Sequence, residues 1–283
     1  MKIIRARHLG FCFGVRDAIA LAGREASRRP VTILGELVHN EMVLRDLRRA
    51  GAEFAQDPAQ IRTSLVMITA HGASDRKRQE LQARGLEVIE ATCPLVTHAH
   101  QCLRELVASG YHPVVVGRRD HVEVLGLTGD FDDFDVILEP EDVSRMRERS
   151  KFGVVAQTTQ PVVRARSLVE LLQSRFPHSE VKFVDTVCQP TKQRQAAAEE
   201  LAPQCDVVVV IGGALSNNTR ELVATCRRYR TRVHHVQTAE DLNRDWFKLS
   251  DTVGLTAGTS TPDATVDEVE RCLEALFESA AKV

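Results

Sequence analysis

An internal repeat is the feature of this sequence that most constrains its fold. Three times, a cysteine is followed by a helical pattern, then by an apolar strand that ends in glycine, and four residues later by a polar side chain. The cysteines are Cys12, Cys93 and Cys188, and the glycines follow them after 23, 24 and 24 residues. Because 81 and then 95 residues separate the cysteines, each repeat has the size of a small α/β unit rather than of a solenoid repeat.

Buried strands alternate with helical patterns along the whole chain. Strands are predicted at 31–34, 65–69, 114–116, 152–155, 207–211 and 252–256, and a shorter strand precedes each cysteine, at 3–4, 86–89 and 181–184. Helices are predicted at 16–28, 42–49, 97–108 and 191–201. Such alternation favours mostly parallel sheets, whose ligands bind beyond the carboxyl ends of the strands. We therefore predict an α/β fold of three similar units, residues 1–85, 86–180 and 181–283, in a pseudo-threefold arrangement around one shared site.

The charge balance favours a small ligand. The formal net charge is −2, from 37 basic and 39 acidic residues, which gives no electrostatic reason to expect nucleic acid or membrane partners. The first residues lack the apolar segment of a secretory signal, and no stretch approaches the roughly 20 apolar residues that span a bilayer. We expect a cytoplasmic protein.

The cysteines divide into two groups. Seven is an odd number in a chain without an export signal, so a disulfide framework is not expected. Four of them lie in or beside amphipathic helical patterns and are interpreted as ordinary thiols: Cys102, Cys205, Cys226 and Cys272. Cys12, Cys93 and Cys188 instead follow an extended segment and precede a predicted helix, whose N-terminal amides favour a thiolate.

Three thiolates around one point suit an iron–sulfur cluster or a three-thiolate zinc site. The paired cysteines of a zinc knuckle are absent from the sequence. A cluster is normally held by four thiolates, so three would leave one iron without a protein ligand. An open position on a metal is a catalytic position, because a substrate can bind there directly.

Polar side chains at the predicted strand ends suit a bound anion. His39, His71 and His121 can donate hydrogen bonds to an anion near neutral pH. Neutral donors with glycines beside them come from Ser216, Asn218 and Ser260. A single histidine at a strand end is usually structural, but three in matching positions favour a site for a phosphate or diphosphate.

One carboxylate lies within this set. Glu123 follows His121 by two residues and could relay protons if it is buried beside a metal, although a solvated loop acid is the simpler interpretation of Glu123 alone. Thr158 and Thr159 could orient a substrate hydroxyl or pass a proton to it, and a role in capping the preceding strand is the alternative.

The motifs around these residues resemble one known family. They are Gly10-Phe11-Cys12-Phe13-Gly14-Val15, Gly35-Glu36-Leu37-Val38-His39-Asn40, Ala70-His71-Gly72, Ala91-Thr92-Cys93-Pro94-Leu95-Val96, His121-Val122-Glu123, Gln157-Thr158-Thr159, Cys188, Ser216-Asn217-Asn218-Thr219, and Thr256 to Asp263. In type and order they resemble the LytB/IspH family of 4-hydroxy-3-methylbut-2-enyl diphosphate reductases over nearly the whole chain.

The resemblance implies a cofactor, a site and a reaction. The implied cofactor is an oxygen-sensitive 4Fe-4S cluster at the centre of the three units, held by Cys12, Cys93 and Cys188, with the fourth iron open to the substrate's hydroxyl oxygen. The reaction removes that hydroxyl as water, with two electrons and two protons, and yields isopentenyl and dimethylallyl diphosphates in the last step of the non-mevalonate pathway. A ferredoxin or flavodoxin is the expected electron donor. The implied substrate-binding residues are His39, His71, His121, Thr158, Thr159, Ser216, Asn217, Asn218 and Ser260, and Glu123 with Thr158 is implied in proton delivery.

Two residues depart from the family's pattern. Asn217 stands where the family has a second serine that binds diphosphate, and Phe13 stands where a small residue is frequent. They leave open a related reductase with a shifted substrate preference. The other hypotheses are a non-catalytic iron–sulfur or redox-sensing protein, which would not need Glu123, and a zinc hydrolase with a three-cysteine site.

Overall fold

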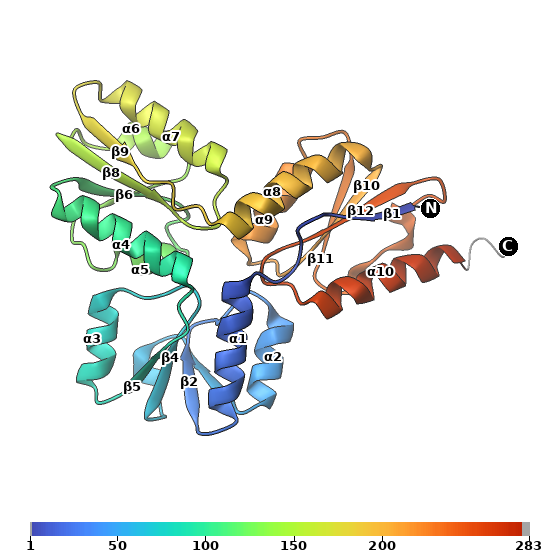
Figure 1. Ribbon diagram of the computed structural model, residues 1–283, viewed down its shortest axis with the longest axis horizontal. Coiled ribbons are helices and arrows are strands. Elements are labelled where there is room, and N and C mark those ends of the chain that lie inside the picture. Colours follow the sequence, from blue (N-terminus) through green and yellow to red (C-terminus); the bar gives the residue numbers. More distant parts are fainter. Residues whose placement is uncertain (1, 279–283) are drawn as a thin grey trace. The chain divides into compact units, whose positions relative to one another are not determined.

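The computed structural model describes residues 2–278 (Figure 1). These residues form two compact units. Unit 1 comprises residues 2–13, 39–43 and 189–278, and unit 2 comprises residues 14–38 and 44–188. The two units are described separately below.

Strands and helices alternate as the sequence predicts. The strands are β1 (Lys2–Arg5), β2 (Val31–Leu34), β3 (Ala52–Ala55), β4 (Leu65–Ile68), β5 (Glu87–Glu90), β6 (His112–Val116), β7 (Asp135–Ile137), β8 (Lys151–Ala156), β9 (Glu180–Phe183), β10 (Val207–Ile211), β11 (Arg232–Val236) and β12 (Thr252–Ala257). The α-helices are α1 (Phe13–Ala26), α2 (Glu41–Arg49), α3 (Asp75–Ala83), α4 (Pro94–Ala108), α5 (Val122–Thr128), α6 (Pro140–Arg145), α7 (Val162–Arg175), α8 (Gln189–Leu201), α9 (Asn217–Cys226) and α10 (Asp263–Glu278). Short 3-10 turns are η1 (Pro58–Gln60), η2 (Ala202–Gln204), η3 (Ala239–Asp241) and η4 (Arg244–Trp246).

The described residues form three four-stranded sheets, and every strand pair in them is parallel. Unit 1 contains the sheet β1-β12-β10-β11, and unit 2 contains the sheets β5-β4-β2-β3 and β9-β8-β6-β7. The order is the same in all three: the strand that precedes a cysteine lies at one edge and the strand that ends in the repeat's glycine lies inside. The predicted α/β fold class with parallel sheets is therefore confirmed, and the repeat is visible in the topology.

The strand before each cysteine pairs within the sheet of the preceding repeat. β5 pairs with β4, from Leu65 opposite Glu87 to Ile68 opposite Glu90, and β9 pairs with β8 in the same way. Strands 86–89 and 181–184 were expected in the same unit as the cysteines that follow them, so this pairing differs from the prediction. β1 pairs with β12, so the first strand belongs to the sheet of the last repeat. The chain thus passes from one sheet to the next through the three cysteine loops.

The burial of each strand explains whether it could be predicted from the sequence. The central strand β10 is a run of five apolar residues that are fully buried, as expected for a parallel strand covered on both faces. The edge strands β3, β7 and β11 were not predicted, because their half-exposed positions carry polar residues such as Glu53, Asp135 and His235. Helices α1, α4 and α8 begin at the residue after each cysteine, two or three residues earlier than predicted.

Candidate active site

The predicted site residues follow the carboxyl ends of strands. In unit 1 they are Cys12 after β1, Ser216, Asn217 and Asn218 after β10, and Ser260 after β12. In unit 2 they are His71 after β4, Cys93 after β5, His121 and Glu123 after β6, Thr158 and Thr159 after β8, and Cys188 after β9. His39 follows β2 in the chain but is grouped with unit 1. Because the strands of each sheet are parallel, the residues of one sheet gather at the same edge.

The start of α9 in unit 1 is organised for an anion. Ser216 is the N-cap of this ten-residue helix, and its side chain accepts a hydrogen bond from the amide of Thr219 at 3.3 Å. The Oδ1 atom of Asn218 accepts one from the amide of Thr259 at 3.1 Å. This bond fixes the orientation of the side-chain amide, and the buried Nδ2 atom of Asn218 has no hydrogen-bond partner. A buried donor of this kind is stabilised by an acceptor from a ligand.

His39 and Ser260 lie beside this helix start in unit 1. The hydroxyl of Ser260 donates a hydrogen bond to the carbonyl of His39 at 3.4 Å. A Cβ atom on Gly213 would lie 2.1 Å from the same carbonyl, so only glycine fits at this position. Unit 1 therefore brings the loop after β10, the loop after β12 and the backbone of His39 together, as the sequence predicts.

Glu123 and Thr158 form a buried pair in unit 2. The side chain of Glu123 is 1% exposed and accepts hydrogen bonds from the Thr158 amide at 2.6 Å and the Thr158 hydroxyl at 3.0 Å. Burial raises the pKa of Glu123 to about 7, against the two hydrogen bonds, which lower it. Glu123 lies buried in the first turn of α5 and is not a solvated loop acid. A carboxyl group in this environment can hold a proton near neutral pH and release it.

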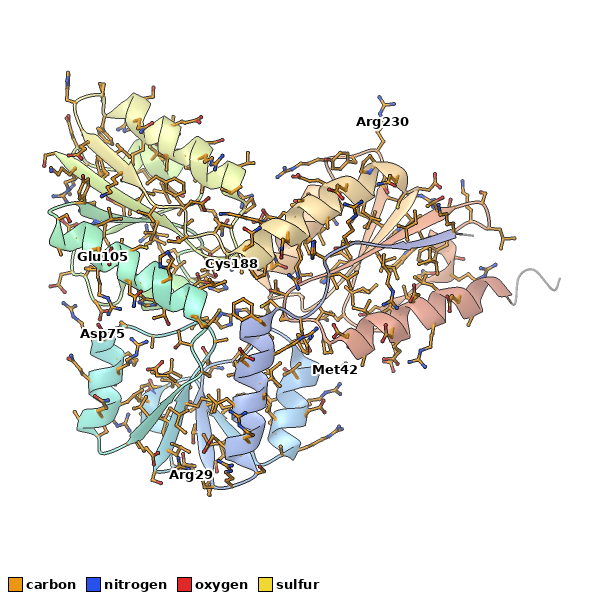
Figure 2. The ribbon with its side chains drawn as sticks, viewed as in Figure 1. Arg29, Met42, Asp75, Glu105, Cys188 and Arg230 are labelled. Carbon is orange, nitrogen blue, oxygen red and sulfur yellow. The ribbon has the colours of Figure 1, made fainter. Side chains whose placement is uncertain are left out.

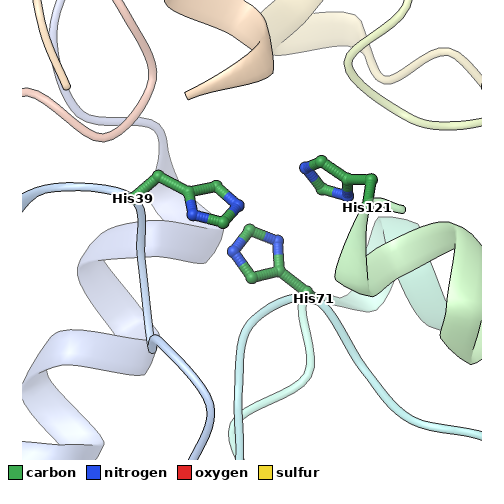
Figure 3. Close-up of side chains that lie close together, drawn as sticks. All are labelled: His39, His71 and His121. Carbon is green, nitrogen blue, oxygen red and sulfur yellow. The ribbon is translucent and has the colours of Figure 1, made fainter. Parts of the chain in front are cut away.

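His71 and His121 are neighbours in unit 2 (Figure 3). Their rings meet edge to face, with centroids 5.4 Å apart. The Nδ1 atom of His121 accepts a hydrogen bond from the amide of Glu123 at 3.1 Å, which caps α5. In the neutral ring, the proton is therefore on Nε2, which can donate to an anion.

Glycine allows the His71 turn to pack against the start of α4. Gly72 has a φ of +76°, and a Cβ atom there would lie 3.1 to 3.3 Å from side-chain atoms of Val96, Thr92 and His100. His100 is buried at this contact, and burial lowers its pKa to about 4, so it is a neutral packing residue. The turn that carries His71 therefore lies against the helix that begins after Cys93.

The thiols of Cys12, Cys93 and Cys188 fit a metal–sulfur site. All three are half-buried, and each is followed directly by a helix, as Figure 2 shows for Cys188 and α8. In unit 2, the Sγ atom of Cys93 lies 2.5 Å from where a Cβ atom of Gly14 would be, so the start of α1 approaches this thiol closely. The amide of Cys188 donates to the carbonyl of Thr158 at 3.0 Å, next to the Glu123 pair.

Three of the four remaining cysteines are buried packing residues, and Cys272 is half-buried. Burial raises the pKa of Cys102, that of Cys205 to about 11 and that of Cys226 to about 12. Cys205 and Cys226 belong to one apolar cluster in unit 1. Thiols of this kind are poor metal ligands because the thiolate is disfavoured.

A cavity of about 390 Å³ lies within unit 2, beyond the carboxyl ends of β2 and β4. Its lining is mainly apolar and includes Leu34, Gly72, Val122 and Leu125. His71 and His121 precede two of these residues in the chain but do not line the cavity. The cavity is therefore separate from the predicted anion-binding side chains.

Comparisons with known proteins find the same family over nearly the whole chain. The family model described as LytB protein matches residues 3–274. A 4-hydroxy-3-methylbut-2-enyl diphosphate reductase of Trichlorobacter lovleyi is 37% identical over 281 residues, which cover 99% of this chain and 100% of the relative. A reductase of the same name from Aquifex aeolicus is 35% identical over 284 residues, with 98% of each chain covered.

Two solved structures share the fold. The E-1-hydroxy-2-methyl-but-2-enyl-4-diphosphate reductase from Plasmodium falciparum matches with a TM-score of 0.91 and 27% identity, over 96% of this chain and 87% of that chain. An (E)-4-hydroxy-3-methyl-but-2-enyl diphosphate reductase, described as the terminal enzyme of the non-mevalonate pathway, matches with a TM-score of 0.70 and 34% identity, over 97% and 100% of the two chains.

Proposed function

Because the chain belongs to the LytB protein family, we propose that it reduces 4-hydroxy-3-methylbut-2-enyl diphosphate to isopentenyl and dimethylallyl diphosphates, the terminal step of the non-mevalonate pathway. The observation that carries the proposal is the buried Glu123–Thr158 pair, which lies in the same unit as Cys93, Cys188 and His121. A protein that only senses redox state has no need of a buried proton donor. The pair therefore favours an enzyme over a sensor.

Cys12, Cys93 and Cys188 would hold a 4Fe-4S cluster, one thiolate from each repeat, with the fourth iron open. When bound, such a cluster supplies electrons and a Lewis-acidic iron for the hydroxyl group that leaves. The half-buried thiols at the starts of α1, α4 and α8 fit this donor set. Overall, the substrate's C–OH bond is replaced by C–H with two electrons and two protons, and water is released. In this proposal the predicted units 1–85, 86–180 and 181–283 share one site.

The proposed diphosphate-binding residues are neutral donors and histidines. In unit 1, the unpaired Nδ2 of Asn218, the N-terminal amides of α9 and the hydroxyls of Ser216 and Ser260 supply neutral donors. In unit 2, Nε2 of His121 is oriented as a donor because Nδ1 accepts from Glu123. His39, His71, Thr159 and Asn217 complete the proposed set, and Asn217 at the first position of α9 replaces a serine hydroxyl by a longer amide.

Glu123 would deliver the proton that turns the leaving hydroxyl into water. With a pKa of about 7, a substantial fraction of Glu123 carries a proton at neutral pH. The hydroxyl of Thr158 donates a hydrogen bond to the Glu123 carboxylate and would orient the substrate hydroxyl or pass the proton to it. Loss of hydroxide alone is unfavourable, so the proton lowers the barrier directly.

A small ferredoxin or flavodoxin is the proposed electron donor, and the cytoplasm is the proposed location. Among the residues that the structure describes, no helix combines the length and the apolar character needed to cross a bilayer.

Anaerobic turnover tests the function. Protein with a reconstituted cluster is mixed with reduced viologen dye and the substrate, and both dye oxidation and the five-carbon products are measured. We expect substrate-dependent oxidation that yields both diphosphates. Protein with a full, reducible cluster that leaves the substrate unchanged would contradict the proposal, and Asn217→Ser would then test whether this departure shifts the substrate preference.

A further inference from the structure

A buried arginine donates several hydrogen bonds to the loop that leads to Cys12 in unit 1. Arg194, on α8, is 6% exposed. Its Nε and Nη2 atoms both donate to the carbonyl of Gly10, at 3.0 and 2.6 Å, and Nη2 also donates to the carbonyl of Phe11 at 3.1 Å. Its Nη1 atom donates to the carbonyl of Pro190 at 3.0 Å, which ties the side chain to the first turn of its own helix.

The opposite edge of the same loop is held by the end of β12. The amide of Gly10 donates to the carbonyl of Ala257 at 3.3 Å, and the amide of Cys12 donates to the carbonyl of Thr259 at 3.2 Å. The loop therefore has its amides bonded to one element and its carbonyls bonded to Arg194. Gly10 is in the left-handed region, with a φ of +71°, so the loop has a sharply defined path between these two anchors.

The shape of the guanidinium group matters at this position. Its planar fork reaches two successive carbonyls at once, which the single ammonium group of lysine cannot do in the same geometry. Hydrogen bonds from a charged donor to neutral acceptors are stronger than those between neutral groups, and burial strengthens them further. Outer groups of this kind orient ligands at metal sites and change metal affinity about 10- to 100-fold when removed.

We propose that Arg194 is a positioning residue that holds the Cys12 loop in the shape in which its thiolate binds the cluster. The proposal rests on the cluster of the proposed function but concerns a residue that the sequence analysis did not single out. Arg194 acts through the backbone of Gly10 and Phe11. α8 begins at the residue after Cys188, so one helix both follows one ligand in the chain and fixes the loop of another.

Arg194→Gln and Arg194→Lys test the proposal, with Arg232→Gln as the control. Arg232 also donates to a backbone carbonyl in unit 1, that of Trp246 at 2.8 Å, and to the carboxylate of Asp251 at 2.7 Å, but in a segment without a predicted ligand. Hydrogen–deuterium exchange is measured on the cluster-free proteins for peptides that contain Cys12, Cys93 and Cys188. The rate at which a chelator removes iron is then measured on the reconstituted proteins by visible absorbance.

We expect both Arg194 variants to exchange at least 10-fold faster at the amides of residues 10–12, with peptides around Cys93 and Cys188 unchanged. Iron loss should be about 10-fold faster than in the unmodified protein, and Arg232→Gln should match that protein in both measurements.

Three results would overturn the proposal. The first is Arg194→Gln with unchanged exchange and unchanged iron loss. The second is faster exchange across the whole of unit 1, which would make Arg194 a residue of the general fold. The third is an Arg194→Lys variant that behaves like the unmodified protein, because a positive charge alone would then hold the Cys12 loop. Arg194→Lys also tests the proposal if Arg194→Gln does not fold. Unmodified protein that assembles no cluster would instead refute the proposed function, and the exchange measurement would still test Arg194.

Discussion

At the scale of single residues, Glu123 has the most consequential environment in unit 2. Desolvation makes the charged carboxylate unfavourable, so the folded protein binds a proton that an ordinary glutamate would release. Between the unperturbed pKa of 4.5 and the folded value of about 7, the free energy of unfolding falls as pH rises, by about 3 kcal/mol in total. Burial of Glu123 therefore lowers the free energy of unfolding at neutral pH, and it keeps the proton that the proposed function uses.

Glu123→Gln should abolish most turnover and remove this pH dependence of stability. Turnover of the unmodified protein should fall as pH rises through about 7, because the proton on Glu123 is lost. Without that proton, the rate should drop about 100-fold or more. Steady-state rates and urea unfolding between pH 5 and 8 measure both effects. Glu105→Gln, at an exposed position of α4, is the control, and full turnover by Glu123→Gln would remove Glu123 from the mechanism.

Thr158→Val should move the pH profile upward. The Thr158 hydroxyl bonds the carboxylate and so lowers the pKa of Glu123; without it, the pKa rises and the alkaline loss of activity shifts to higher pH. Thr158→Ser keeps the hydroxyl and should keep the original profile. The rates are measured against pH, and an unshifted profile for Thr158→Val would show that the Thr158 hydroxyl does not contribute to the pKa of Glu123.

At the scale of elements, the cysteine loops depend on close approach between backbone and thiol. Gly14 lies in the first turn of α1, and a Cβ atom at this position would lie 2.5 Å from Sγ of Cys93, which leaves no space for a side chain. Helix α1 can therefore begin directly after Cys12 while the thiol of Cys93 lies against its first turn. Any side chain at position 14 has to displace one of the two.

Gly14→Ala should impair cluster assembly while the fold persists. A Cβ atom 2.5 Å from Sγ of Cys93 forces the thiol out of place, and we expect less than half of the iron and sulfide content of the unmodified protein after anaerobic reconstitution. Gly23→Ala is the control, because the same helix has open space there and alanine favours helix by up to about 1 kcal/mol. Equal iron content in both variants would show that the Gly14 contact does not matter.

The sequence also misses how the loop after β10 is held. The unpredicted edge strand β11 and the residue after it supply the support: Nε2 of His235 bonds the carbonyl of Gly212 at 2.8 Å, and the side chain of Gln237 accepts from the amide of Ala214 at 3.1 Å. No periodic pattern marks these residues, because β11 is half-exposed and mixes polar with apolar side chains. Arg194 was missed for a related reason, since a charged residue in a helical pattern is normally solvated.

At the scale of the whole molecule, the family, the reductase assignment and the α/β class expected from the motifs are confirmed. They were predictable because the cysteine-to-glycine spacing and the buried central strands are periodic. The exchange of edge strands between repeats was not predictable, since a short half-buried strand such as β5 or β9 can pair with either neighbour. The roles of the individual site residues stay predictions.

Removal of the cluster should leave the secondary structure intact. Each sheet packs its own buried apolar residues, for example around Phe152 in the sheet of β8 and around Leu255 in the sheet of β12. Apolar burial therefore stabilises these sheets independently of the proposed cluster. After anaerobic chelation we expect an unchanged far-UV circular dichroism spectrum and a lower melting temperature, because a ligand that binds only the folded state stabilises it. Collapse of the spectrum on chelation would contradict this prediction.

The pairing of β1 with β12 has a consequence for how the protein is made. The ribosome delivers the chain from its first residue, so β1 and the Cys12 loop emerge long before the strand and the carbonyl of Thr259 that hold them. Arg194 also arrives late. The repeats in between can fold while synthesis continues, but the Cys12 loop waits for β12, the last strand of the described residues. If Cys12 binds the proposed cluster, that ligand is therefore positioned only late in synthesis, and a chain that stops before β12 lacks the anchors of its loop.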